Sequence, residues 1–329
     1  MKIFKKNIHE EKDLNVEEYG NIFTGLAVLF VFTFIIMAVI LMNFVVDSNQ
    51  INSDNLASHE FNYVVQDYNK NIGIFGKNTI RDLANEVIKN KISSHNSADE
   101  IKNNLQTILN DKANDYYKNT GVNFKSEVLS VYNGEDPFHL NVKTLVTATK
   151  GKSEYNHVVE TKISIEELKD PLPFLMCKEH PTLFENGTKI YYNDAISYYL
   201  SSKNLLNPEV YENATSPLFI RKCPFDPYEH HGNKYGMKNC IDNGYFHESA
   251  DGGCYLCRLE GKATCFHYGL ETFIVPQAVS SLNQSSISGS DHVIFYDNYP
   301  GDTIVFYEEN GLYEILILDN SHGAKYGMN

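Results

Sequence analysis

The sequence contains no tryptophan and comparatively few basic residues. Its 329 residues include 28 Lys and Arg against 42 Asp and Glu, which gives a formal net charge of −14. Because neutralising nucleic-acid phosphates requires clustered Lys and Arg, this balance excludes nucleic acid as an expected partner. The 22 tyrosines suit half-buried strands and wet surfaces, and they indicate β-rich, exposed structure.

Common catalytic motifs are also missing. There is no G-x-S-x-G, no H-E-x-x-H and no phosphate-cradling glycine loop, so nothing supports the enzyme classes that these motifs mark. Cys254, His292 and Asn320 follow the order of papain-like enzymes, but with short spacing and different flanking residues. We expect a non-enzymatic protein. The alternative is an ecto-enzyme or zinc-binding domain that uses Cys254, Cys257 and nearby histidines.

An uncharged apolar run covers residues 22–46. As a helix it is long enough to span a hydrocarbon core of about 30 Å. No A-x-A-like site ends the run, and residues 16–20 match an archaeal pilin signal poorly, so we expect an uncleaved membrane anchor. Four lysines precede the run, whereas the first basic residue after it is Lys70. The positive-inside rule therefore predicts a cytoplasmic tail at residues 1–21 and an extracellular position for residues 47–329.

Three Asn-x-Ser/Thr sequons agree with that orientation, because all of them lie beyond the apolar run. The glycosylation candidates are Asn186, Asn213 and Asn283.

The segment after the anchor, residues 47–170, predicts a helix-plus-sheet domain. Apolar residues recur at helical spacing over residues 55–90, where Gly73 and Gly76 are expected to break or bend the helix. A second helix is expected to begin at Ser97 with a capping box to Glu100 and to stop at residues 120–121. Period-two patterns over residues 140–148 and 155–165 then predict an antiparallel hairpin.

Residues 171–215 predict a connecting segment with a short helix at 195–200, and residues 216–329 predict a Cys-rich, β-rich head. Strands are expected at 292–296, 303–307 and 312–318, the last two as a hairpin, and the Ser-rich residues 280–290 are expected to form an exposed loop. The fold class is therefore α+β.

All six cysteines lie beyond the apolar run, and five of them fall within 43 residues. An even count in a loop-rich extracellular segment predicts a disulfide framework, worth about 3 kcal/mol per loop. Zinc is the alternative, because Cys254-x2-Cys257 is half of a tetrahedral thiolate site, and no other cofactor is expected. The residues that could form disulfides, or complete one zinc site, are Cys177, Cys223, Cys240, Cys265, His230, His231, His247 and His267.

Two resemblances bear on lineage. The layout of a lone anchor, an amphipathic helix and a small sheet resembles the pilin-like and TadE-like proteins of prokaryotic envelopes, which implies other envelope or pilus-like subunits as partners. Residues 257–261, 268–273, 291–295 and 318–326 resemble, in order, a pattern in uncharacterised surface proteins of methanogenic archaea. This second resemblance implies a location and a lineage, with no reaction or ligand.

The polar residues within that pattern have two interpretations. As buried ion pairs they would fix the loop-rich head on its sheet, and as a cluster they would form a polar ligand pocket. We favour the structural role. The residues are Arg258, Glu260, Glu271, Asp291 and His322.

Overall fold

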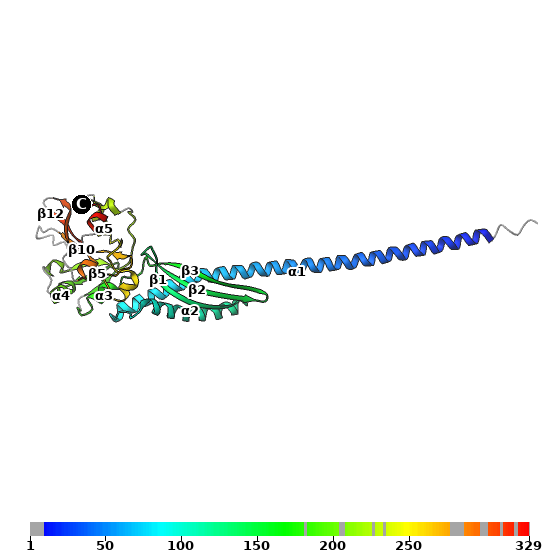
Figure 1. The fold of residues 1–329 in the computed structure, drawn as a ribbon, viewed down its shortest axis with the longest axis horizontal. Helices are drawn as coiled ribbons and strands as arrows, with labels where there is room; N and C mark the ends of the chain where they lie inside the picture. Colours follow the sequence, from blue (N-terminus) through cyan, green and yellow to red (C-terminus); the bar gives the residue numbers. More distant parts are fainter. Residues whose placement is uncertain are drawn as a thin grey trace, which may run out of the picture. The chain divides into compact units, whose positions relative to one another are not determined.

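A long helix, α1, opens the described chain in the computed structural model and runs unbroken from Glu10 to Asn90 (Figure 1). Within it, Phe23–Asp47 forms a span of 25 residues that is apolar enough to cross a membrane, and its side chains are exposed. This N-terminal helix is compatible with a signal or an anchor. The structure describes residues 10–180, 183–203, 208–225, 228–232, 235–276, 286–296, 302–309, 312–318 and 322–328.

The chain divides into two units, residues 1–63 and residues 64–329. In the second unit, the end of α1 and helix α2 lie beside a three-stranded antiparallel sheet of order β1-β2-β3 (Figure 1). The elements are α2 (Ser97–Thr120), β1 (Asn123–Asn133), β2 (His139–Lys150) and β3 (Ser153–Ser164). The buried apolar side chains of α1 and α2 share the core with alternate residues of the strands, since successive strand side chains point to opposite faces. The predicted helix-plus-sheet layout and the β2–β3 hairpin are confirmed.

The expected break at Gly73 and Gly76 is wrong, because α1 continues through both residues. A Cβ on Gly76 would lie 2.3 Å from Cδ1 of Ile163, and one on Gly73 would lie 3.2 Å from Cγ2 of Thr161. These glycines therefore let β3 approach the helix closely.

Two further details of this region differ from expectation. Helix α2 is capped one residue earlier than predicted, by Asn96, whose side chain accepts the backbone N–H of Asp99 at 3.2 Å. Strand β1 was not predicted, because Ser126 interrupts the apolar alternation between Phe124 and Val128. Ser126 is buried and hydrogen-bonded to Tyr68 at 2.8 Å.

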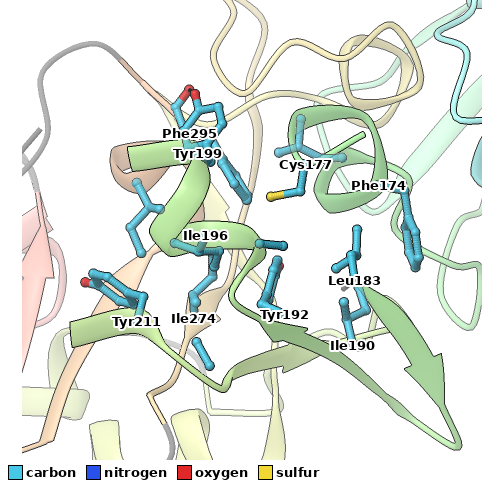
Figure 2. Close-up of a cluster of buried hydrophobic side chains, with 14 of the residues drawn as sticks. Phe174, Cys177, Leu183, Ile190, Tyr192, Ile196, Tyr199, Tyr211, Ile274 and Phe295 are labelled. Carbon is cyan, nitrogen blue, oxygen red and sulfur yellow. Dashed lines mark hydrogen bonds between the residues drawn. The ribbon is translucent and has the colours of Figure 1, made fainter. Parts of the chain in front are cut away.

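The next part of the chain forms a small sheet and an apolar core around it (Figure 2). The sheet has the order β4-β5-β6 and is antiparallel throughout. The predicted helix at 195–200 is confirmed as α4. The elements are α3 (Leu172–Met176), β4 (Phe184–Asn186), β5 (Lys189–Asn193), α4 (Ala195–Ser202), η1 (Pro208–Tyr211) and β6 (Ala214–Pro217).

The Cys-rich region consists of short elements, namely η2 (Tyr228–Gly232), α5 (Gly236–Asn243), β7 (His247–Ser249), α6 (Tyr255–Leu259) and β8 (Gly269–Glu271). Strands β7 and β8 pair antiparallel. A mixed sheet of order β11-β12-β10-β9 follows, in which β10 and β12 are parallel. The remaining elements are β9 (Phe273–Ile274), β10 (Ser286–Ser290), α7 (Asp291–Ile294), β11 (Asp302–Glu309), β12 (Leu312–Leu318) and α8 (His322–Lys325).

The predicted β11–β12 hairpin is confirmed, and two neighbouring predictions are wrong. Residues 291–294 form a helical turn in place of a strand, closed by the hydrogen bond from the Phe295 N–H to the Asp291 carbonyl at 2.9 Å. Residues 286–290 form a strand in place of an exposed loop, and residues 280–285 lie outside the described residues. The parallel partner β12 comes from further along the chain, so local composition did not indicate it.

Candidate metal centres

Eight Cys and His side chains converge in two groups within the Cys-rich region. In each group the potential ligand atoms all lie within 4.8 Å of one another. We call the first the Cys2His2 centre and the second the Cys3His centre. They consist of Cys223, His231, Cys240 and His247, and of Cys254, Cys257, Cys265 and His267, respectively.

Four different short elements position the Cys2His2 centre. Cys223 follows an extended segment whose backbone pairs with Phe246, the residue before His247. The backbone N–H of Cys223 donates to the Phe246 carbonyl at 2.9 Å. His231 lies in η2, Cys240 lies on α5, and His247 begins β7. Four side chains from a stretch of 25 residues therefore converge on one site.

The Cys2His2 centre is enclosed. Each of its four residues is 2% exposed or less. The rings of Tyr228 and Tyr326 lie 5.0 and 5.3 Å from the His247 ring. A ring this deeply buried normally has its nitrogens hydrogen-bonded. Apart from the Cys223 thiol, neither ring nitrogen of His247 has a hydrogen-bond partner, so a bound cation is the group that fits this position.

Electrostatics also favour a cation in the Cys2His2 centre. The sulfur atoms of Cys223 and Cys240 are 3.4 Å apart, and Nε2 of His231 lies 3.3 Å from the Cys223 sulfur. The hydrogen bond from the Cys240 thiol lowers the pKa of Cys223 to about 3 and raises that of Cys240. Nδ1 of His231 lies 2.7 Å from the carbonyl oxygen of Tyr228, so a proton on Nδ1 would leave Nε2 free to bind a metal.

The Cys3His centre is built around α6. Cys254 precedes this helix and Cys257 lies within it, while Cys265 and His267 follow a turn. Nδ1 of His267 lies 3.7 Å from the sulfur atoms of both Cys254 and Cys257. The backbone N–H of Cys254 donates to the Cys265 sulfur at 3.3 Å, and Nδ2 of Asn133 donates to the Cys254 sulfur at 3.0 Å. Such hydrogen bonds stabilise thiolates, and those from the neighbouring thiols lower the pKa of Cys265.

Glycines shape the loop that carries the Cys3His centre. A Cβ on Gly253 would lie 2.5 Å from the Lys262 carbonyl, and one on Gly269 would lie 2.2 Å from the Gly252 carbonyl. The Gly253 N–H donates to the Ala263 carbonyl at 2.7 Å. The backbone strands on either side of Cys254 and Cys265 therefore pack in direct contact, and only glycine fits between them.

Four of the separations between ligand atoms are close to those expected around tetrahedral zinc. Bonds of about 2.3 Å to sulfur and about 2.0 Å to nitrogen place neighbouring ligand atoms about 3.4–3.8 Å apart. The 3.3, 3.4 and 3.7 Å separations lie at or close to this range. Sets of two or three thiolates with imidazole are typical of structural zinc sites. Four protein ligands fill a tetrahedral metal and leave no open position for a substrate.

All six cysteines are free in the structure, so the disulfide framework expected from the sequence is not what it shows. A disulfide would require a sulfur separation of about 2.0 Å, and the Cys223 and Cys240 sulfur atoms are 3.4 Å apart. The alternative expected from the sequence was one zinc site, whereas the structure contains two groups of potential metal ligands. Cys177 belongs to neither centre and fills the apolar core, where burial raises the pKa of its thiol (Figure 2).

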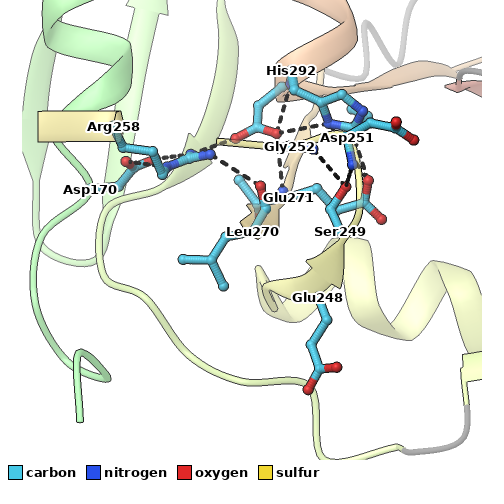
Figure 3. Close-up of polar contacts among 12 residues, drawn as sticks. Asp170, Glu248, Ser249, Asp251, Gly252, Arg258, Leu270, Glu271 and His292 are labelled. Atoms are coloured by element: carbon cyan, nitrogen blue, oxygen red, sulfur yellow. Dashed lines mark hydrogen bonds and ion pairs between the residues drawn. The ribbon is translucent and has the colours of Figure 1, made fainter. Parts of the chain in front are cut away.

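A buried cluster of charged residues surrounds Arg258 on α6 (Figure 3). Its guanidinium donates to Asp170 at 2.9 and 2.5 Å, to Asp291 at 2.5 Å, and to the Leu270 carbonyl at 3.4 Å. All three charged side chains are 1% exposed or less. Burial opposes ionisation of Asp291, but the positive charge of Arg258 and the interactions with His292 together outweigh it and hold the pKa of that carboxyl below its usual value.

Of the other predicted polar residues, Glu271 joins this cluster through His292, whose Nδ1 lies 3.6 Å from Glu271 and 3.7 Å from Asp291. Glu271 is buried and hydrogen-bonds to Lys325 at 2.6 Å and to the Tyr326 hydroxyl. Glu260 instead accepts from Ser97 and pairs with Lys262. Arg258 therefore pairs with Asp291, which belongs to the predicted set, and with Asp170, which does not. The side chain of His322 lies outside the described part of the structure.

Two of the three sequons are described. Asn186 on β4 and Asn213 in a turn are both exposed, whereas Asn283 lies outside the described residues.

The proposed papain-like order is not assembled around Cys254. This thiol lies with Asn133 and His267, whereas His292 lies with Ser290 and Glu271. Asn320 is outside the described residues.

The sequence contains a signal for the Cys2His2 centre as a separate set of ligands. Cys223, His231, Cys240 and His247 alternate in the chain with six to eight residues between neighbours. Comparison with known proteins adds no identification, since no family model matches the chain and no similar curated protein or solved structure was found. The fold and the two centres define the chain as an α+β protein with one N-terminal apolar helix and two Cys/His clusters able to bind metal.

Proposed function

We propose that this chain is a single-pass membrane protein that presents a zinc-stabilised, non-enzymatic head on the outer side of the membrane. The observation that carries the proposal is the convergence of four ligand atoms in each of two clusters. Each head would bind two zinc ions as structural cross-links.

The packing of the Cys-rich region supports a structural role for the metals. Its secondary structure is short, with β7 and β8 of three residues each and α6 of five residues. Elements this small have few intramolecular contacts of their own, and structural zinc supplies folding free energy directly in such regions. Zinc would take the role that the sequence analysis gave to disulfides.

The membrane part of the proposal rests on α1. The apolar span Phe23–Asp47 has no charged residue before Asp47, and four lysines precede it. An uncleaved helix with this flanking charge directs the N-terminus to the cytoplasm. Metal-bound thiolates are compatible with an external position in a reducing habitat, and the exposed Asn186 and Asn213 remain candidates for glycosylation there.

An envelope assembly is the proposed setting of the head. The helix-plus-sheet arrangement of α1 and β1–β3 supports a pilin-like or adhesin-like role, in which other envelope subunits are the partners. The net charge of −14 argues against partners with strongly anionic surfaces.

Metal content tests the proposal. The full-length chain, purified in detergent under anaerobic conditions, is expected to contain two zinc ions per chain by elemental analysis. Cys240→Ser and Cys257→Ser should each reduce this to one. Cys177→Ser is the matched control, because Cys177 is buried but belongs to no cluster, and it should keep two. Wild-type chain without zinc, or equal zinc loss in all three variants, would overturn the proposal.

Topology requires a separate measurement. In sealed right-side-out vesicles, an added protease should digest the head while a tag at the N-terminus stays protected. Protection of the head with digestion of the tag would reverse the orientation and leave the zinc centres unaffected.

A further inference from the structure

The two centres differ in their access to solvent. Every ligand of the Cys2His2 centre is 2% exposed or less, whereas Cys265 and His267 of the Cys3His centre are partly exposed. Phe266, between these two ligands, is 94% exposed. Small solutes can therefore reach the second centre without unfolding of the head.

A pocket leads to the Cys3His centre. It has a volume of about 530 Å³, and three of the four ligands, Cys257, Cys265 and His267, form part of its wall. Ala98 of α2 also lines this pocket and is not one of the four ligand residues. A pocket of this size admits a small oxidant as well as the water that accompanies it.

We propose that the Cys3His centre is a modification site, at which a peroxide converts the thiolates of Cys265 and Cys257 into a disulfide and the zinc ion leaves. This inference rests on the proposed zinc binding. Solvent access selects these two sulfurs, because Cys254 does not line the pocket and is 1% exposed. Their separation of less than 4.8 Å allows a disulfide to form with small local movement.

The reaction balances with hydrogen peroxide as the oxidant. The Cys265 thiolate attacks one peroxide oxygen, the O–O bond breaks, and a sulfenic acid and hydroxide form. The Cys257 thiolate then attacks the sulfenic sulfur, the S–S bond forms, and a second hydroxide leaves. Two electrons pass from the two sulfurs to the peroxide, and two protons convert the hydroxides to water. The zinc ion departs because two of its four ligands are consumed.

The modification would act on the junction between the head and the first sheet. Helix α6 carries Cys257, and its N-terminal part is tied to that region. Asn133 of β1 donates to the sulfur of the N-cap residue Cys254, and the Ser97 hydroxyl of α2 donates to the Leu256 carbonyl at 3.0 Å. Loss of the metal removes the cross-link that holds α6 in place, so it should increase amide exchange at both contacts.

The test follows zinc release from the full-length, zinc-loaded chain in detergent after hydrogen peroxide is added, with a chromophoric chelator as the indicator. One zinc ion per chain should leave at least about tenfold faster than the other, and peptide mapping should find a disulfide between Cys257 and Cys265. Ala98→Phe, which fills the pocket, should slow the fast phase several-fold. Ala113→Phe, on the same helix but outside the pocket, should leave both phases unchanged.

Each other result has a distinct meaning. A chain that holds no zinc before peroxide overturns the proposed function and this inference together. A chain with two zinc ions that loses both at one rate, or loses the buried one first, overturns this inference alone. The same holds if Ala98→Phe and Ala113→Phe behave identically.

Discussion

Replacing Arg258 with glutamine removes the single guanidinium that neutralises two buried carboxylates. Asp170 and Asp291 are each 1% exposed, and Arg258 donates to both. Truncating one partner of a buried ion pair commonly costs about 3–5 kcal/mol, because the remaining charge stays desolvated. We expect a loss of this size in the free energy of unfolding, which lowers the ratio of folded to unfolded head by about two to four orders of magnitude.

Near-UV circular dichroism of the tyrosines during urea unfolding measures this loss, with zinc held in excess. Arg221→Gln is the matched control, because Arg221 is exposed and its guanidinium lies 5.3 Å from the Tyr245 ring. Its cost should stay within about 1 kcal/mol. If Arg258→Gln costs no more than Arg221→Gln, the buried carboxylates are compensated in some other way and the reasoning fails. Arg258→Lys keeps the charge without the forked geometry and should lie between the two.

Three further predictions concern metal, packing and pH. A strong chelator such as EDTA should lower the melting temperature of the head, and added zinc should restore it. An unchanged melting temperature after confirmed metal removal would contradict a structural role. Gly76→Ala should destabilise the chain by about 1–3 kcal/mol and Gly73→Ala by less, because the added methyl groups meet β3 at 2.3 and 3.2 Å, respectively. Equal costs in urea unfolding would show that Ile163 moves aside freely. Burial and the hydrogen bond to Asp67 raise the pKa of Tyr116 to about 12. The folded state therefore keeps a proton that the unfolded state loses, and stability should fall as pH rises from about 10 to 12. Tyr116→Phe should flatten this slope, and an identical slope in that variant would refute the assignment.

The sequence predicted the elements whose signal is local. The apolar run within Phe23–Asp47, the helical periodicity of α1 and α2, and the alternation in β2 and β3 each follow from the spacing of side chains on one face. The β11–β12 hairpin likewise follows from two strand patterns close together in the chain.

The failures have a non-local cause. Gly73 and Gly76 looked like helix breakers, but their role is set by Ile163 and Thr161 on a strand some ninety residues further along the chain. Strand β10 was mistaken for a loop because its parallel partner β12 lies beyond it in the sequence. Tertiary contacts of this kind override local propensity.

The sequence predicted which residues form the candidate sites, but it did not predict how these residues are grouped. The cysteines and histidines that form both centres were all considered as possible ligands. Their division into two sets depends on how η2, α5, β7 and α6 are placed, which spacing alone does not define. The same reasoning explains why Asp170 was missed as a partner of Arg258, since 88 residues separate them.

The most direct test of the two closed zinc centres is zinc K-edge X-ray absorption on the full-length chain, with the zinc content measured on the same sample. The account predicts two zinc ions per chain, with an average shell of two to three sulfurs at about 2.3 Å and one to two nitrogens at about 2.0 Å. A chain without zinc, or a shell dominated by oxygen, would contradict it.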